Sequence, residues 1–354
     1  MTSAVAMLPG SSAARSPLSL RAYIEASGLR SVVIGPSKDP NAKITVLLVS
    51  PQDGNAVLAV KAPTTDAAAR ALEREEDLLV GLSKLRLPAL ADTISHVVDA
   101  VDFNGRRGVV TNALHGTAMA TTYLRWRHTA SPGRVARDFD AVARWLGEFQ
   151  AATATDAAPV DLDGGVRSRL RIRFAADEQL EDDLVRLEEL YARLGQHSVP
   201  RTAVHGDLWF GNILLDRGEI TGVVDWECGA VSGEPVRDLV RFALVYSLYL
   251  DRRTRHGRSV AGHPALRADR WGAGVEYALE GEGWYPELVR QFLCSGLARL
   301  GASPSAWRDA LLAGVAEVAA FTDDDEFARR HLELFRRLAR GGQPPRKVIE
   351  GRVI

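Results

Sequence analysis

The chain has 354 residues, of which 46% are hydrophobic and 25% are charged, so it is long enough to bury a large core. Its formal net charge of -1 argues against a nucleic-acid partner or a membrane-surface partner. It contains two cysteines, too few for a disulfide framework or a cysteine-based metal site, which favours a reducing, cytoplasmic location.

Residues 1–18 are rich in Ser, Ala, Gly and Pro, and no cationic region precedes an apolar core there. We therefore expect a flexible N-terminal tail and no signal peptide. No apolar stretch in the sequence reaches the ~18 residues of a membrane span. Together with the balanced charge, this composition predicts a globular protein without a membrane partner.

Two runs rich in β-branched residues, 31–34 and 44–49, predict a β-hairpin. The residues between them, 35–43, contain two prolines and one glycine. They contain no G-x-G-x-x-G, and no G-x-x-x-x-G-K-[ST] phosphate loop occurs anywhere in the chain. Any phosphate-covering loop must therefore be an atypical one.

The run 56–61 follows a turn and predicts a further strand, with Lys61 at its far end. A helix is expected through about residues 66–82, with Asp66 as its N-terminal cap. Its leucines recur at helical spacing, and Glu75 lies on the same stripe as they do. The charged residues around Glu75 otherwise fit a solvated helix face.

Residues 107–111 predict another strand, which leads through a short linker to Gly116. Beyond it, apolar residues at three- and four-residue spacing predict helices through 135–149 and 180–194. The second helix is flanked and covered by acidic residues, which form either a solvated face or the wall of a binding pocket. These residues are Asp177, Glu178, Glu181, Asp182, Asp183, Glu188 and Glu189.

The most informative segment reads His-Gly-Asp-Leu-Trp-Phe-Gly-Asn at 205–212, followed by Asp-Trp-Glu at 225–227. Asp207 and Asn212 have the spacing of the protein-kinase loop H-R-D-x-x-x-x-N, in which Asp accepts the proton of the substrate hydroxyl and Asn binds Mg²⁺. Asp225 follows an apolar strand, as does the second Mg²⁺ ligand of kinases. The pattern predicts Asp207 as the catalytic base and Asn212 and Asp225 as Mg²⁺ ligands.

With His-Gly-Asp in place of His-Arg-Asp, and Gly-Glu-Pro-Val-Arg-Asp-Leu at 233–239, the sequence resembles the aminoglycoside phosphotransferase and choline kinase family. Members of that family phosphorylate hydroxyls of small molecules on a protein-kinase-like fold. The resemblance implies an α+β, two-lobe fold. Its small N-lobe (19–111) would hold an antiparallel sheet and one helix, 112–116 would form the hinge, and the larger C-lobe (117–354) would be mainly helical.

The resemblance also implies a nucleotide site. Lys61 would bind the α- and β-phosphates of ATP or GTP, and Glu75 would pair with it, although Glu73 and Glu76 remain open as partners. Only five of the 44 basic residues are lysines, which favours a functional role for the lysine at this strand end. Ser37 is either a phosphate contact or part of an ordinary turn. The backbone of the hinge would read the base, through Asn112, Ala113 and Leu114.

His205 is expected to make structural hydrogen bonds, Asp238 to support the catalytic loop, and Glu227 to assist with metal or substrate. Trp209 and Phe210 either contact the acceptor or pack into the core. The remaining candidates for the acceptor site are Asp182, Asp183, Trp284 and Tyr285, each with a packing or solvent-exposed alternative.

The predicted function is phosphoryl transfer from a nucleotide to a hydroxyl of a small molecule, with an aminoglycoside, macrolide or nucleoside antibiotic as the first choice of acceptor. A metabolic kinase for a sugar, amino sugar, choline or homoserine is the alternative within enzymes. A catalytically inactive kinase-like binding protein is the alternative outside them. The sequence leaves open whether the protein is a monomer or a homodimer.

Overall fold

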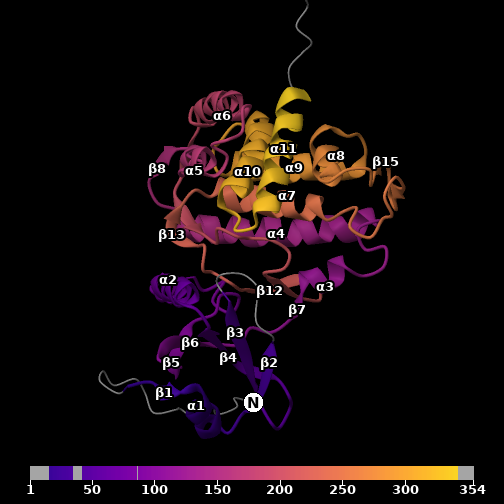
Figure 1. The fold of residues 1–354 in the computed structure, drawn as a ribbon. Coiled ribbons are helices and arrows are strands. Elements are labelled where there is room, and N and C mark those ends of the chain that lie inside the picture. Colours follow the sequence, from indigo (N-terminus) through magenta and orange to yellow (C-terminus); the bar gives the residue numbers. More distant parts are fainter. Residues whose placement is uncertain (1–15, 35–41, 86, 342–354) are drawn as a thin grey trace, which may run out of the picture. The chain divides into compact units, whose positions relative to one another are not determined.

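A computed structural model of the chain describes residues 16–34, 42–85 and 87–341 (Figure 1). These residues form two compact units. The first contains the described residues up to Arg125, together with Arg144–Ala154 and Thr202–Gly233. The second contains Trp126–Ala143, Thr155–Arg201 and the described residues from Glu234 onward. Ser37 lies outside the described residues.

The first unit is built on a six-stranded sheet in the order β1-β5-β6-β4-β3-β2. Neighbouring strands are antiparallel, except that the short β1 pairs parallel with β5. The predicted hairpin is formed by β2 and β3, and the run that ends near Lys61 is β4. The strands are β1 (Leu18–Ser19), β2 (Arg30–Ile34), β3 (Lys43–Val49), β4 (Ala56–Pro63), β5 (Val97–Phe103) and β6 (Arg106–Asn112).

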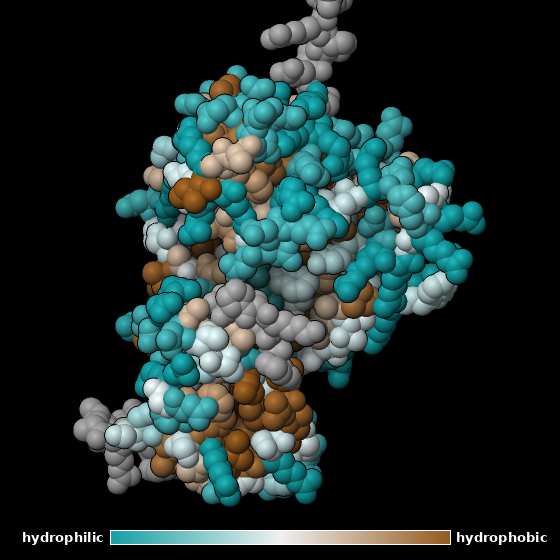
Figure 2. All heavy atoms as spheres, viewed as in Figure 1, coloured by the Kyte–Doolittle hydropathy of each residue, from teal (hydrophilic) through white to brown (hydrophobic). Residues whose placement is uncertain are grey.

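One face of this sheet is buried. Val46, Leu48 and Val60 are almost inaccessible and pack with Tyr23 of helix α1 (Leu20–Ser27). The edge strand β2 is different, because its residues 32–34 are at least half exposed, and brown apolar surface covers this strand in Figure 2. Because side chains alternate along β3 and β4, the face of these strands opposite the buried one is available for polar side chains.

Helix α2 (Asp66–Ser83) is the helix predicted to carry Glu75. Its cap differs from the prediction: the Thr65 hydroxyl, not Asp66, accepts a hydrogen bond from the Ala68 N–H. Threonine serves here because its backbone is extended, as an N-cap requires, whereas Asp66 is already helical and lies in the first turn. A negative charge in the first turn is still favourable to the helix dipole.

The rest of the first unit holds two small sheets, ordered β12-β11-β7 and β10-β13. They flank the loop that carries the sequence motif at 205–212. Their bounds, with the short helix beside them, are β7 (Thr117–Ala118), α3 (Met119–Tyr123), β10 (Thr202–Val204), β11 (Ile213–Asp216), β12 (Glu219–Val223) and β13 (Ala230–Gly233).

The second unit is mainly helical. The two helices predicted from periodicity are present as α4 (Pro132–Thr153), which contributes residues to both units, and α6 (Leu180–Leu194). In the described ranges, no helix is both long and apolar enough to span a membrane. The other elements are β8 (Ala157–Pro159), α5 (Val166–Arg173), β9 (Ser198–Pro200), α7 (Val236–Leu248), β14 (Ser259–Val260), β15 (His263–Arg267), α8 (Ala273–Glu280), α9 (Trp284–Arg299), the 3₁₀ helix Pro304–Ala306, α10 (Trp307–Phe321) and α11 (Asp325–Gly341).

Aromatic side chains form the centre of the second unit. The ring of Phe139 in α4 meets Phe242 and Tyr246 of α7, and Phe292 of α9, in edge-to-face contacts with centroids 4.9 to 5.2 Å apart. Such contacts add to the burial of apolar area, so they fix how these helices pack. The mixed α+β composition predicted from the sequence is confirmed.

His331 in α11 should make the protein sensitive to acid. It is 1% exposed, and its burial lowers its pKa to about 4. Between pH ~6.5 and ~4 the unfolded chain therefore binds a proton that folded His331 does not, and stability falls as the pH is lowered. We expect His331→Leu to reduce this fall in the free energy of unfolding by up to about 3 kcal/mol. Urea unfolding at pH 4.5 and pH 7.5 measures the difference.

The matched control is His256→Gln, since His256 is exposed. This control should keep the pH dependence of the wild type. An identical fall in unfolding free energy in His331→Leu and wild type would contradict the assignment.

Candidate active site

Strand β4 and helix α2 bring Lys61 and Glu75 together. Leu58 and Val60 point into the core, so alternation turns the side chain of Lys61 to the other face of the sheet. Its Nζ lies 2.6 Å from Glu75 Oε1. The same carboxylate oxygen accepts a hydrogen bond from the Trp226 backbone N–H at 3.2 Å. The predicted ion pair is therefore present, and it is tied to the segment that follows β12.

Lys61 has a second partner in Asp225, whose Oδ1 also lies 2.6 Å from Nζ. Burial opposes the charge on Lys61, but the carboxylates of Glu75 and Asp225 outweigh it and raise the pKa of Lys61. In return the Lys61 ammonium, assisted by Lys43, lowers the pKa of Asp225 to about 2 against the effect of burial. Both groups are consequently charged at neutral pH.

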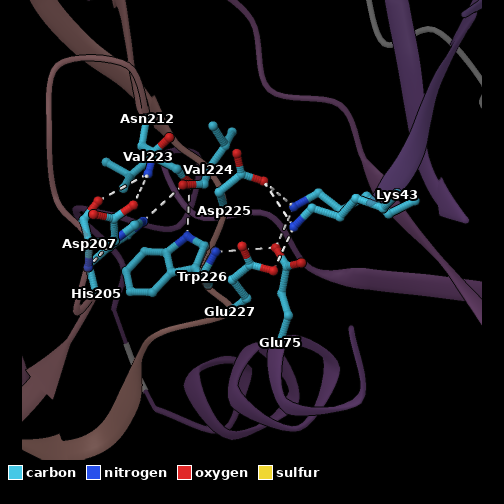
Figure 3. A network of polar contacts seen from close by, with 11 residues as sticks. Lys43, Glu75, His205, Asp207, Asn212, Val223, Val224, Asp225, Trp226 and Glu227 are labelled. Atoms are coloured by element: carbon cyan, nitrogen blue, oxygen red, sulfur yellow. Dashed lines mark hydrogen bonds and ion pairs between the residues drawn. The ribbon is translucent and has the colours of Figure 1, made fainter. Parts of the chain in front are cut away.

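Lys43, the first residue of β3, reaches the same cluster (Figure 3). Its Nζ lies 2.7 Å from Glu227 Oε2 and 3.9 Å from Asp225 Oδ1. No role was predicted for Lys43 from the sequence, although lysines are rare in this chain and their rarity could have marked it. Glu227, expected to assist with metal or substrate, is thus the direct partner of this second ammonium group.

The loop between β10 and β11 carries the predicted base. The Asp207 N–H donates to His205 Nδ1 at 3.2 Å, so this nitrogen is an acceptor, and Nε2 donates to the Val224 carbonyl at 2.8 Å. His205 is fully buried and joins the loop to the segment before Asp225 (Figure 3). Its contacts are those of the structural residue that the sequence predicts.

The glycine of His-Gly-Asp has a steric cause. Gly206 has a φ of 78°, and a Cβ at this position would lie 2.1 Å from the Cys228 carbonyl oxygen. No side chain fits between these backbones, and the left-handed conformation itself favours glycine. The close approach lets the loop carrying Asp207 pack against the segment after Asp225.

Asn212 is held by the same loop. Its side-chain Nδ2 donates to the Asp207 backbone carbonyl at 3.0 Å, and its backbone carbonyl accepts from the Val224 N–H at 2.9 Å. Asp225 follows directly with a φ of 64°, a left-handed conformation that is unusual for a residue with a side chain. Asn212 and Asp225 are therefore linked by the backbone hydrogen bond between Asn212 and Val224. Both side chains offer oxygen atoms that can bind a metal ion.

A divalent cation is the ligand that this donor set suits. Mg²⁺ prefers hard oxygen ligands and keeps several waters, so a carboxylate and an amide oxygen are sufficient from the protein. In the described ranges, no group of three or more His, Cys, Asp and Glu residues has the arrangement of a self-sufficient metal site. The residues therefore fit a cation that completes its coordination with water and phosphate oxygens.

The expected hinge residues lie at the end of β6. The Asn112 N–H donates to the His96 carbonyl and the Ala113 N–H donates to the Val57 carbonyl. The Asn112 side chain also accepts from the His96 N–H at 2.7 Å. Two of the three backbone donors expected to read a base are thus used within the protein, which leaves Leu114 as the candidate.

The two aromatic residues of the loop separate. Phe210 is buried and stacks on Tyr123 with ring centroids 4.3 Å apart, so it is a packing residue and not an acceptor contact. Trp209 is partly exposed, and its ring covers Gly211. Of the two, Trp209 alone keeps a surface that an acceptor can reach.

The predictions for the acidic helix need correction. Asp182 is exposed, but Asp183 is completely buried and its Oδ2 lies 2.6 Å from Nε of Arg336 in α11. Asp177 also contacts Arg336, at 2.8 Å. Asp183 therefore belongs to neither a solvated face nor a pocket wall, because a buried carboxylate needs its ion-pair partner.

The two remaining acceptor candidates, Tyr285 and Trp284, differ in their exposure to solvent. Tyr285 is fully buried, with its hydroxyl 2.9 Å from the Ser247 hydroxyl, so of its two alternatives it takes core packing. Trp284 is partly exposed, and its indole N–H donates to the Gly262 carbonyl. Asp238, expected to support the catalytic loop, is buried in the first turn of α7.

Comparison with known proteins identifies the fold and the family. No curated protein sequence matches the chain. The fold is similar to that of aminoglycoside phosphotransferase APH(2'')-Ib with bound ADP, at 16% identity and a TM-score of 0.52 over 90% of this chain and 96% of that one. It is also similar to aminoglycoside phosphotransferase APH(4)-Ia, at 13% identity and a TM-score of 0.52 over 92% and 98% of the two chains.

The TM-scores and the coverage show a shared fold, the kinase-like fold predicted from the sequence. The family assignment comes from a family model described as "Phosphotransferase enzyme family" (APH), which matches residues 43–272. The matched segment contains Lys43, Lys61, Glu75 and the whole loop from His205 to Glu227. Since it covers well over half of the chain, the protein belongs to the phosphotransferase enzyme family (APH) and is a small-molecule kinase.

Proposed function

We propose that the protein transfers the γ-phosphoryl group of ATP or GTP, with Mg²⁺, to a hydroxyl of a small molecule. The observation that carries this proposal is the contact of Lys61 with both Glu75 and Asp225, next to the loop that holds Asp207 and Asn212. A lysine paired with a helical glutamate, beside a carboxylate that can hold Mg²⁺, is the arrangement that kinase chemistry requires. An inactive binding protein has no need for all of these groups.

The residues have separate tasks in this proposal. Asp207 orients the acceptor hydroxyl and accepts its proton as the phosphoryl group is transferred. Lys61 binds the phosphates, and Glu75 fixes the position of its ammonium group. Asn212 and Asp225 would hold Mg²⁺, which neutralises charge on the β- and γ-phosphate oxygens when bound. Catalysis would come mainly from positioning and electrostatic stabilisation.

The base would be read at residues 112–116, which we propose as the hinge of the two-lobe fold. In the described ranges the Leu114 N–H donates to no other group, whereas those of Asn112 and Ala113 are engaged. A purine edge that accepts one hydrogen bond from Leu114 suits both ATP and GTP. The choice between these two nucleotides therefore depends on groups other than this donor.

An antibiotic is the proposed acceptor. The related solved structures include complexes with streptomycin and ATP, and with AMP-PNP and hygromycin B. The acidic residues around α6 give less support for a polycationic acceptor than their number suggests, because Asp177 and Asp183 are neutralised by Arg336. We therefore favour a hydroxyl-rich acceptor that is not strongly cationic, such as a macrolide or nucleoside, with a metabolic kinase as the alternative.

A nucleotide-coupled screen tests this function. Purified protein is incubated with ATP or GTP, Mg²⁺ and a panel of antibiotics and common metabolites, and nucleoside diphosphate release is measured. We expect acceptor-dependent release with at least one antibiotic, and no such release with Asp207→Asn in the same screen. Release with a sugar, choline or homoserine alone would instead support the metabolic kinase, and nucleotide binding without release would support the inactive protein.

A further inference from the structure

The second lysine of the cluster lies where a phosphate contact can be made. The β3–β4 register pairs Thr45 with Lys61, and Lys43 is two residues from Thr45, so Lys43 and Lys61 project from the same face of the sheet. The Lys43 side chain is 11% exposed, and its ammonium group lies among the carboxylates of Asp225 and Glu227. Figure 3 shows Lys43 directed toward these two residues.

Charge shows why two ammonium groups are not redundant. The cluster contains the carboxylates of Glu75, Asp225 and Glu227 and the ammonium groups of Lys43 and Lys61. If Asp225 binds a divalent cation, as proposed, that cation competes with both lysines for its oxygens. Glu75 and Glu227 still hold the two lysines, and each ammonium group has three N–H donors, so both retain donors for another anion.

The choice of residue also indicates a phosphate. Lysines are five of the 44 basic residues, and two of the five converge on Asp225. Elsewhere in the described chain, carboxylates such as Glu76 and Asp309 are bound by two nitrogens of an arginine. Lysine is a compact charge on a flexible stem, which lets it contact a carboxylate and a phosphate together.

We propose that Lys43 is a second phosphate-binding lysine, positioned by Glu227, which contacts the nucleotide's terminal phosphates beside Lys61. The inference rests on the proposed function, because it requires that a nucleotide binds at Asp225. It assigns Lys43 to substrate binding and Glu227 to positioning. The competing explanation is that Lys43 only neutralises the charge of Glu227.

Calorimetry with a phosphate series tests the contact. Dissociation constants are measured for adenosine, AMP, ADP and ATP with Mg²⁺, and for the guanine series in parallel. We expect Lys43→Met to weaken triphosphate binding about tenfold or more, the scale of a charged hydrogen bond, and to leave nucleoside binding unchanged. Lys84→Met removes an exposed lysine elsewhere and should match the wild type throughout.

The double variant Lys43→Met/Glu227→Gln decides between the two explanations. It removes one charge of each sign, so it restores the net charge of the cluster without restoring the donor. Under the proposal it still binds the triphosphate about tenfold more weakly than the wild type. Wild-type affinity in the double variant would overturn the proposal, because Lys43 would then act only as a counterion for Glu227.

Two other results would also overturn it. One is unchanged triphosphate binding in Lys43→Met, and the other is an equal loss for nucleoside and triphosphate, which would indicate structural damage. Thermal melting of each variant accompanies the titrations. Failure of the proposed function is distinguishable, because the wild type would then bind neither nucleotide series, or would bind nucleotide without acceptor-dependent release of nucleoside diphosphate. Failure of the Lys43 contact alone leaves wild-type binding and release intact.

Discussion

Replacing Asp207 with Asn is expected to lower kcat by about 10²–10⁴-fold while nucleotide affinity changes little, because a general base acts on the transition state. The change should not disturb the loop. Its order depends on the Asp207 backbone, which donates to His205 and accepts from Asn212, and both contacts survive the substitution. Steady-state kinetics with the acceptor found by the screen, and nucleotide titration of the same protein, measure the two quantities.

Asp216→Asn is the matched control, since Asp216 is exposed at the end of β11, a few residues from the loop, and undergoes the same chemical change. It should keep wild-type kcat. Near-normal turnover in Asp207→Asn would exclude Asp207 as the base. A parallel loss of nucleotide binding would indicate that the carboxylate supports the site and not the proton transfer.

The sequence predicts those parts of the site that depend on local pattern. The spacing of Asp207 and Asn212 and the strand before Asp225 can be read because a single turn and hairpin determine them. The pairing of Lys61 with Glu75 is implied by the family resemblance, with Glu73 and Glu76 left open, and helical periodicity places Glu75 on the leucine stripe. In the structure Lys61 Nζ lies 2.6 Å from Glu75 Oε1.

Other features of the site depend on contacts between segments that are distant in the sequence. Local patterns do not reveal such contacts. Lys43 meets Glu227 across 184 positions of sequence, and Arg336 meets Asp183 across 153. An acidic residue on an amphipathic helix appears solvated when its partner lies on an unrelated helix. The role of Tyr285 stays open in the sequence for a similar reason, because an aromatic residue has the same local pattern in a core as in a pocket.

The N-cap of α2 is a smaller difference between the prediction and the structure. Thr65 and Asp66 are both good N-cap residues, and the choice between them depends on which backbone is extended. That conformation is set where the chain leaves β4, so the helix itself does not determine it. The error of one residue leaves Glu75 on the same face.

Replacing Asp225 with Asn should have the second large effect. The Asp225 carboxylate has a pKa of about 2, so it is ionised at neutral pH and is a charged ligand available for Mg²⁺. We expect the Mg²⁺ concentration for half-maximal activity to rise about tenfold or more, because the variant keeps one weak oxygen ligand in place of a charged one. A Mg²⁺ titration of activity measures this shift.

Nucleotide binding without metal provides the control for Asp225→Asn. Lys61 keeps its contact with Glu75 in the variant, and one negative charge near the phosphates is removed. Metal-free nucleotide should therefore bind as tightly as to the wild type or more tightly, while binding of the Mg²⁺ complex weakens. Opposite shifts with and without metal identify Asp225 as a metal ligand. Equal weakening in both conditions would show instead that its main task is to position Lys61, and an unchanged Mg²⁺ requirement would exclude it from the metal site.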